Sequence, residues 1–291
     1  LLKMMSASTQ TSASKWRGPQ VHLFRALTGH ELSLTRAEEV RITGMCGRYA
    51  QTLGAEEIVE AFDLAGSTLD QSLPLNWNIA PTNPIYIIRA NDQSGKDTET
   101  KKALAIVSWG LIGPWLTDFQ EARASQSRAI NARSESIHEK PTFRNAFRAT
   151  RCLIPASGYY EWATALGKYS PKQPFYISSR DDKQLPIAGI WSSWRAPGGE
   201  VIETASIITQ EAQGELATIH SRMPVFMPQD RWDTWLNPRN TDVNELKSLM
   251  VVEHPESIVK AHPVSSAVNT VANNGKGLIV ELPLGEPETL F

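Results

Sequence analysis

The sequence is short of several features that define large classes of proteins. Its 291 residues include only two cysteines, Cys46 and Cys152. Two are too few for a disulfide framework, so a reducing intracellular setting is expected. The net charge of −2 supplies no overall positive field, so nucleic acid could be bound only through a local basic patch. No apolar run approaches the roughly 20 residues of a membrane span, and no membrane partner is expected.

Motifs for a metal ion or a phosphate group are also lacking. No His and Cys residues stand at the spacing of metal ligands, so no metal is expected. No glycine-rich loop could hold a phosphate, and no cofactor is expected. What the chain has is a 41% hydrophobic composition with nine tryptophans. This composition is typical of a globular protein.

The pattern of the chain changes at residue 45. Residues 1–44 show little helical or strand periodicity. We expect an N-terminal extension there that is disordered, removed or not natively translated, and a transit peptide is the alternative. From residue 45 the pattern is that of a folded domain, which we expect to span 45–283. Residues 284–291 are expected to form a flexible tail.

Hydrophobic periodicity predicts the elements of this domain. Helical spacing predicts helices at 55–62, 229–236 and 243–250. Short β-branched or aromatic runs predict strands at 84–90, 103–112, 151–163, 174–179, 185–194, 203–209, 258–265 and 277–282. Strands without regular helical crossovers favour a single α+β domain, with a mainly antiparallel sheet or barrel-like core and short peripheral helices.

One segment, residues 122–151, combines positive charge with aromatic residues. It holds seven Lys and Arg residues against two acidic ones, Glu135 and Glu139, and it includes Phe143 and Phe147. A groove for single-stranded nucleic acid uses cations for phosphates and rings for bases. The alternative, which charge alone favours, is an amphipathic helix whose arginines face water.

Cys46 directly follows Met45. If Met45 is lost, Cys46 carries a free α-amine beside its thiol. An α-amine titrates at about 7.7–8.0, so a useful fraction is neutral at pH 7. The neutral amine can form a Schiff base with an aldehyde, and the thiol can then close a five-membered thiazolidine ring. The alternative is a buried apolar cysteine in a first strand.

Three further residues are candidates for the same chemistry. His220 suits proton transfer near neutral pH. Glu161, flanked by aromatic residues, can act as an acid or base with a raised pKa. Asn131 can bind a substrate or orient the amine. Each has a structural alternative: packing or capping for His220, an outward-facing strand position for Glu161, and a turn for Asn131.

A series of blocks along the chain resembles the SRAP family, the SOS-response-associated peptidases, also described as abasic-site shield proteins. In order, the blocks are MCGRYA from Met45, NWNIAPTNP from Asn76, SWGLIGPW from Ser108, INARSES from Ile130, RCLIPASGYYEW from Arg151, KQPFYI from Lys172, AGIWSSW from Ala188, SIIT from Ser206 and IHSRMPVFM from Ile219. The resemblance covers about residues 45–282, in the order of the family.

The resemblance implies a reaction and the residues that perform it. Cys46 would become N-terminal and form a thiazolidine crosslink with the aldehyde of an abasic site in single-stranded DNA. Autoproteolytic removal of the methionine or the extension would precede this step. Asn131 would position the amine and the sugar, Glu161 would act as acid and base, and His220 would assist ring opening of the sugar.

The same resemblance implies how DNA is bound. The implied phosphate contacts are Arg48, Arg133, Arg144 and Arg222, with a hydroxyl from Thr209, and the residues beside flanking bases are Asn78, Pro81 and Trp109. The partner would be single-stranded DNA that contains abasic sites, bound by a monomer. The expected setting is the nucleus if the source is eukaryotic, or the cytoplasm and nucleoid if it is bacterial.

The sequence departs from the family in front of Cys46, because Met45 is internal here. Three explanations are open, in this order: translation begins at Met45, residues 1–44 are cleaved off, or the chain is inert because the Cys46 nitrogen stays in an amide. Two other functions also stay open. One is an N-terminal-cysteine amidohydrolase or peptidase acting on other substrates. The other is a non-covalent reader of modified or single-stranded DNA.

Overall fold

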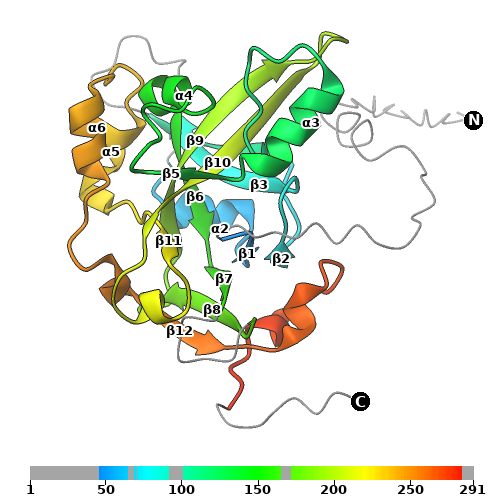
Figure 1. Cartoon of the computed structure of the whole chain (residues 1–291), viewed down its shortest axis with the longest axis vertical. Helices are drawn as coiled ribbons and strands as arrows, with labels where there is room; N and C mark the ends of the chain where they lie inside the picture. Colours follow the sequence, from blue (N-terminus) through cyan, green and yellow to red (C-terminus); the bar gives the residue numbers. More distant parts are fainter. Residues whose placement is uncertain (1–45, 65–68, 70, 92–100, 165–171, 284–291) are drawn as a thin grey trace, which may run out of the picture. The chain divides into compact units, whose positions relative to one another are not determined.

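The computed structural model describes residues 46–64, 69, 71–91, 101–164 and 172–283. The predicted extension at 1–44 and the predicted tail at 284–291 lie outside the described residues. The order of the elements is drawn in Figure 1. None of the helices in the described ranges is long and apolar enough to cross a membrane.

The elements of the described residues are short. The strands are β1 (Arg48–Gln51), β2 (Asn76–Ile79), β3 (Pro84–Ala90), β4 (Lys102–Trp109), β5 (Asn131–Arg133), β6 (Arg151–Ala156), β7 (Gly158–Trp162), β8 (Pro174–Ser179), β9 (Leu185–Arg195), β10 (Val201–Glu211), β11 (Arg222–Pro224) and β12 (Val259–Pro263). The α-helices are α2 (Ala55–Ala61), α3 (Phe119–Arg128), α4 (Arg144–Ala149), α5 (Trp232–Leu236) and α6 (Val243–Leu249). The 3₁₀ helices are η1 (Gly214–Thr218), η2 (Gln229–Arg231), η3 (Pro255–Ile258), η4 (Ser266–Asn269) and η5 (Lys276–Ile279).

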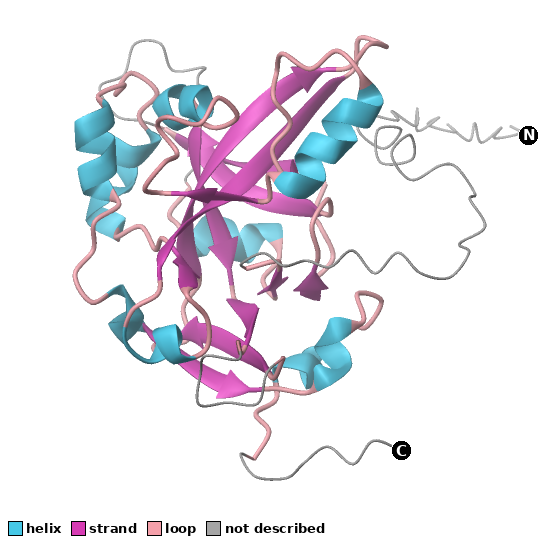
Figure 2. Ribbon diagram, in the orientation of Figure 1, coloured by secondary structure: helices cyan, strands magenta, loops and turns pink. Residues whose placement is uncertain are grey.

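Five strands close into a barrel through their backbone hydrogen bonds. β10 pairs with β4, β4 with β3, β3 with β6, β6 with β9, and β9 returns to β10. Within this ring the β10–β4 pair is parallel and the other pairs are antiparallel. Figure 2 shows the short helices around these strands. The predicted α+β domain, with a mainly antiparallel barrel-like core and short peripheral helices, is confirmed.

A second, antiparallel sheet has the order β12-β8-β7-β1-β2. The chain passes from the barrel to this sheet at Ser157, which separates β6 from β7. The single strand predicted for 151–163 is therefore two strands in different sheets. Its residues are apolar or aromatic on both sides of Ser157, so the sequence pattern held no sign of the break.

The strand predicted at 277–282 was wrong. Residues Lys276–Ile279 form the 3₁₀ helix η5, which follows Gly275 at a φ of 138°. A positive φ suits glycine and ends an extended path. Leu278 is buried by this turn against Tyr160 and Val264, so the apolar run reflects burial and not strand pairing.

One apolar cluster draws residues from both sheets. It includes Cys46, Tyr159 of β7, Ile154 of β6 and Ile207 of β10. Inside it, Tyr49 and Trp109 meet edge to face with ring centroids 5.4 Å apart. Cys46 and Tyr49 are therefore held where the second sheet packs on the barrel.

Arg151 belongs to the basic segment 122–151, yet it is 2% exposed. Its guanidinium donates to the carbonyl oxygens of Phe147, Arg148, Trp235, Asn237 and Asn240. Burial lowers the pKa of Arg151 to about 10, so the side chain stays charged at neutral pH. This cation holds α4 and β6 against α5 and is not available to a ligand.

Replacement of Arg151 by alanine should destabilise the protein strongly. The Arg151→Ala variant leaves several buried carbonyls without donors and opens a cavity, so the free energy of unfolding should fall by about 3 kcal/mol or more. Urea denaturation followed by circular dichroism measures this change. The exposed Arg148, near the end of α4, is the matched control, and Arg148→Ala should change stability by less than about 0.5 kcal/mol. Equal stabilities of the two variants would contradict the structural role of Arg151.

Candidate active site around Cys46

Cys46 lies two residues before the start of β1 and is 2% exposed. Its backbone nitrogen donates to Glu161 Oε2 at 2.9 Å, and its Sγ donates to the same oxygen at 3.2 Å. The antiparallel pairing of β1 with β7 sets Arg48 opposite Tyr160. This register brings the start of β1 to Glu161, 115 residues away in sequence. One carboxylate oxygen therefore binds both the nitrogen and the sulfur of Cys46.

Glu161 faces inward, although an outward position was the alternative from strand alternation. Its residue exposure is 6%, and Tyr159 and Ala163, which alternate with it along the chain, belong to the core cluster around Cys46. Tyr160 and Trp162 pack in a separate apolar cluster on the other face of β7. Both faces of this strand are covered, so alternation could not tell which face holds the carboxylate.

Burial shifts the proton affinities of this pair. Burial raises the pKa of Glu161 above its ordinary value, and this effect exceeds the lowering by nearby His220 and by the hydrogen bonds from Cys46. The pKa of the Cys46 thiol is raised well above its ordinary value, first by burial and then by the charge of Glu161. The thiol is therefore protonated at neutral pH, in agreement with its donation to the carboxylate.

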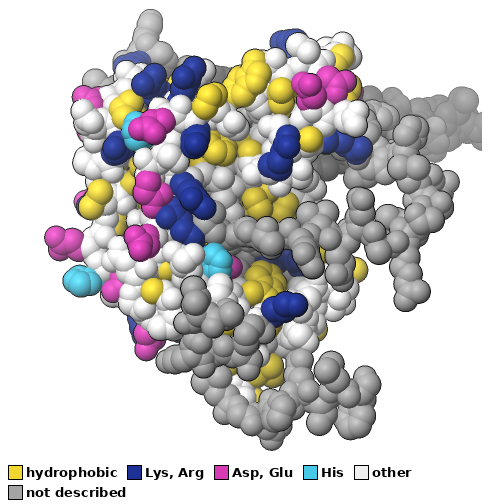
Figure 3. Space-filling model, viewed as in Figure 1, with side chains coloured by type: hydrophobic (Ala, Val, Ile, Leu, Met, Phe, Trp, Pro, Cys, Tyr) yellow, Lys and Arg dark blue, Asp and Glu magenta, His cyan; other side chains and the backbone are white. Residues whose placement is uncertain are grey.

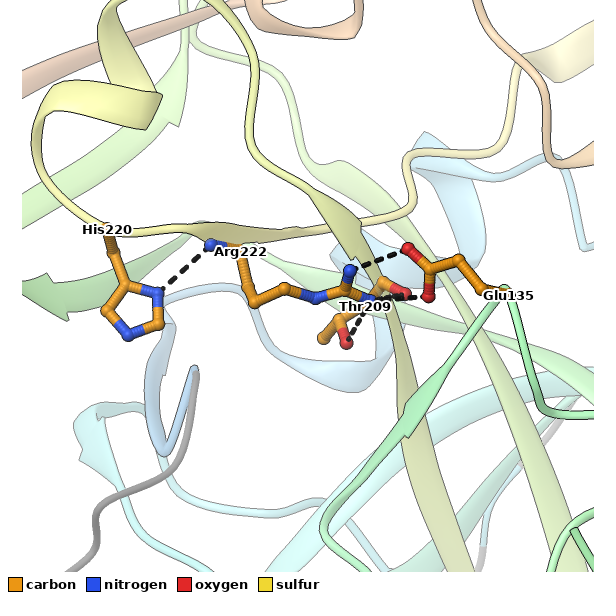
Figure 4. A network of polar contacts seen from close by, with 4 residues as sticks. All are labelled: Glu135, Thr209, His220 and Arg222. Atoms are coloured by element: carbon orange, nitrogen blue, oxygen red, sulfur yellow. Dashed lines mark hydrogen bonds and ion pairs between the residues drawn. The ribbon is translucent and has the colours of Figure 1, made fainter.

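His220 lies on the other side of Glu161. Its Nε2 is 3.9 Å from Glu161 Oε1, and its Nδ1 accepts the backbone N–H of Arg222 at 3.1 Å (Figure 4). Because Nδ1 is an acceptor, the neutral ring carries its proton on Nε2. The ring therefore presents an N–H toward the carboxylate that binds Cys46, at a distance longer than a hydrogen bond.

The backbone of Cys46 has a φ of 37°. A non-glycine residue in this left-handed region is disfavoured by on the order of 1 kcal/mol. The angle φ is a rotation about the N–Cα bond and is defined by the carbonyl carbon of residue 45. The strain therefore exists only while residue 45 is bonded to Cys46, and cleavage of that bond would relieve it.

Arg222 extends the site along β11. Its guanidinium binds Glu135 through two short contacts, and Nη2 also donates to the carbonyl oxygen of Thr209 at 2.8 Å (Figure 4). The Thr209 side chain is buried, with Oγ1 3.5 Å from the same nitrogen. In the sequence, Glu135 stands out only as an acidic residue in a basic segment, because no local pattern shows that β11 brings an arginine to it.

A second polar network holds Arg48 and Asn78. Arg48 Nη1 donates to Asn78 Oδ1 at 2.8 Å and to the Val268 carbonyl at 2.9 Å. The Asn78 amide nitrogen donates to the carbonyls of Val268, Thr270 and Asn273. Arg48 and Asn78 are 6% and 1% exposed, so both side chains fasten the chain around η4 to β1 and β2. Their contact with DNA stays a prediction.

Trp109 is also buried, at 0% exposure. Its indole Nε1 donates to the Ile130 carbonyl at 3.0 Å, which fixes the residue before Asn131. Asn131 begins β5, where it lies opposite Ile207 of β10 and is half-buried. Pro81 is half-buried in the turn after β2. The structure thus places Trp109 as a support for the strand of Asn131, and base contacts by Trp109 and Pro81 stay predictions.

Two of the four predicted phosphate contacts are exposed. Arg133 ends β5 and Arg144 begins α4, and both face solvent. Figure 3 shows Lys and Arg side chains, with a few acidic ones among them, on the face that carries β5, β11 and α4. The structure brings together Cys46, Glu161, His220 and Arg222, while Arg144 stands apart from them in sequence and begins α4.

Comparison with known proteins yields a consistent set of relatives. The family model described as SOS response associated peptidase (SRAP) matches residues 45–271. The abasic site processing protein YoqW of Bacillus subtilis is 35% identical over 240 residues, 81% of this chain and 99% of that protein. The abasic site processing protein HMCES of Gallus gallus is 28% identical over 276 residues, 84% of this chain and 80% of that protein.

A solved structure agrees with these relatives. The crystal structure of a protein from Bacteroides thetaiotaomicron superposes with a TM-score of 0.69 at 25% identity, over 82% of this chain and all of that chain. The family match covers more than half of the chain and includes the segments that hold Cys46, Glu161 and His220. This chain belongs to the SOS response associated peptidase (SRAP) family.

Proposed function

We propose that this chain processes abasic sites in single-stranded DNA by forming a covalent thiazolidine crosslink through Cys46. The relatives that are named abasic site processing proteins support the choice of target. The observation that carries the proposal is the shared contact of Cys46: its nitrogen and its sulfur lie 2.9 Å and 3.2 Å from one oxygen of Glu161. A thiazolidine needs these same two atoms to reach one carbon.

The reaction begins at the nitrogen. An abasic site equilibrates between a closed sugar and an open aldehyde, and a proton donor and acceptor such as His220 speeds ring opening. Ionised Glu161 takes a proton from the α-ammonium of Cys46, and the free amine attacks the aldehyde carbon. The resulting carbinolamine loses one water, with a proton returned by the Glu161 acid, to give a Schiff base.

The sulfur closes the ring. Cys46 Sγ bonds to the imine carbon while the thiol proton moves to nitrogen, with Glu161 as the relay between the two atoms. Since simple imines hydrolyse, ring closure makes the adduct long-lived and shields the lesion. The raised pKa of the Cys46 thiol keeps the sulfur from attacking first. It also disfavours a cysteine hydrolase, which needs a thiolate nucleophile.

The amine exists only if the bond before Cys46 is broken. Glu161 contacts the nitrogen of that bond, so its protonated form can donate to the departing nitrogen during hydrolysis. Relief of the positive φ at Cys46 favours the cleaved state. We therefore assign removal of Met45, or of the whole segment before Cys46, to the same carboxylate. Arg133 and Arg144 supply charge for the DNA backbone without reading its sequence.

The adduct itself is the first test. A version that begins at Met45, mixed with abasic single-stranded DNA, should gain the mass of the DNA less one water in intact mass spectrometry. Cys46→Ala should give no stable adduct, because neither sulfur nor ring remains. The buried Cys152 is the matched control, and Cys152→Ala should react like the parent. The full 291-residue chain should react only after loss of residues 1–45. A stable adduct on Cys46→Ala would refute the thiazolidine.

Replacement of Glu161 should slow crosslinking and change its dependence on pH. The base works only when ionised, so the rate should rise with pH through a limb that lies above the ordinary pKa of glutamate, since burial raises this pKa. In Glu161→Gln the limb should disappear and the rate should fall by about 10²–10⁴-fold. Single-turnover gel assays from pH 4 to pH 9 measure both effects. Glu121→Gln, on the exposed side of α3, is the control. An unchanged profile in Glu161→Gln would remove Glu161 from the mechanism.

The same substitution should stabilise the fold at neutral pH. A raised pKa in the folded state means that the buried carboxylate is unfavourable once ionised. The cost is absent below the ordinary pKa of glutamate, grows as pH rises, and is complete above the folded-state pKa. Glu161→Gln should therefore raise the melting temperature by about 2–4 °C at pH 8, the shift for roughly 1 kcal/mol. The gain should vanish below about pH 4. Calorimetry that finds a loss of stability at pH 8 would contradict this account.

A further inference from the structure

Arg222 is expected to bind a phosphate of DNA, yet its guanidinium already holds an anion. Nη1 donates to Glu135 Oε1 at 2.6 Å and Nη2 donates to Oε2 at 2.8 Å, so the contact is bidentate (Figure 4). Nη2 also donates to the Thr209 carbonyl. A phosphate prefers the same two-nitrogen edge of an arginine that a carboxylate does. That edge of Arg222 is occupied by Glu135.

The two partners differ in how firmly the protein holds them. The Arg222 side chain is 13% exposed, whereas that of Glu135 is 53% exposed. Arg222 lies in β11, which pairs with β10, the strand of Thr209. The Thr209 carbonyl also accepts the N–H of Ser134, the residue before Glu135, at 2.8 Å. The guanidinium is therefore fixed by packing, while the carboxylate borders water. Glu135 can turn into solvent without uncovering Arg222.

The surrounding charges favour an exchange of anions. The pKa of Glu135 is held below its ordinary value, chiefly by the hydrogen bonds from Arg222 and also by the charge of Arg133. Glu135 is thus ionised at neutral pH. Arg133 is exposed two residues away on the same segment, so an approaching phosphate meets one exposed cation and one whose guanidinium is occupied. A half-exposed ion pair contributes little to stability and can be broken by a competing anion.

We propose that Glu135 is an internal competitor for Arg222. Its carboxylate occupies the guanidinium until a phosphate of the DNA strand displaces it, and Glu135 thereby lowers the affinity for single-stranded DNA. The choice of single-stranded DNA as the ligand rests on the proposed function. The competition itself concerns only non-covalent binding. Because the Arg222 backbone holds His220, the exchange takes place beside the residue that faces Glu161.

The test measures binding of the full chain to single-stranded DNA without any lesion. Fluorescence anisotropy at about 0.1 M salt should show that Glu135→Gln binds about three- to fivefold more tightly than the parent, the range that an exposed ion pair supports. Glu211→Gln is the matched control, because Glu211 is exposed and lies opposite Arg222 in the β10–β11 ladder. This control removes the same charge without freeing the guanidinium, so it should change affinity by less than about twofold.

A double-mutant cycle separates competition from a general charge effect. In an Arg222→Met background the gain in DNA affinity from Glu135→Gln should vanish, because no guanidinium remains for Glu135 to occupy. Arg222→Lys serves the same purpose if the methionine variant does not fold, since lysine makes no bidentate contact. Unchanged or weaker binding by Glu135→Gln would overturn the inference. So would an equal gain from Glu211→Gln, or a gain that persists without Arg222.

The adduct assay distinguishes this inference from the proposed function. If the chain forms no adduct with abasic DNA but Glu135→Gln still tightens binding to intact DNA, crosslinking is refuted and the competition stands. If adducts form and Glu135→Gln has no effect on binding, the competition is refuted and crosslinking stands.

Discussion

The site depends on one buried carboxylate. Glu161 has 6% exposure and accepts from both the nitrogen and the sulfur of Cys46. A charge in such a place is unfavourable unless it is bonded, and here the hydrogen bonds come from the backbone nitrogen and the thiol of Cys46. The raised pKa of Glu161 follows from the same burial. The raised pKa and the destabilising effect of the ionised carboxylate therefore have a common origin.

The rest of the fold keeps this contact in place. The ladder between β1 and β7 sets the register that brings Cys46 to Glu161. Arg48 and Asn78 then fasten the chain around η4 to the front of that sheet. On the barrel side, Trp109 packs against Tyr49 and binds the carbonyl before Asn131. Several side chains that resemble ligand contacts in sequence thus act in the structure as supports, because burial commits their polar atoms.

Charge on the face around β5 and β11 is not a uniform positive patch, because Glu135 pairs with Arg222 there. The basic segment 122–151 contributes exposed cations at Arg133 and Arg144 but also the carboxylate that holds Arg222. Arg151 of the same segment is buried on carbonyl groups. A count of positive residues therefore overstates the charge that a DNA strand would meet.

The sequence by itself determined the fold class, most strand and helix positions and the family, and it predicted Cys46 as the reactive residue. Periodicity was enough for β3, β8 and β9, since each is bounded by turn-forming residues. Only the tertiary structure decided the break at Ser157, the inward direction of Glu161 and the pairing of Arg222 with Glu135. These features depend on contacts between residues 87 and 115 positions apart or on which of two covered faces a side chain takes. The local sequence pattern does not show which distant residues meet. It also does not show which face of a strand a side chain takes when apolar residues cover both faces.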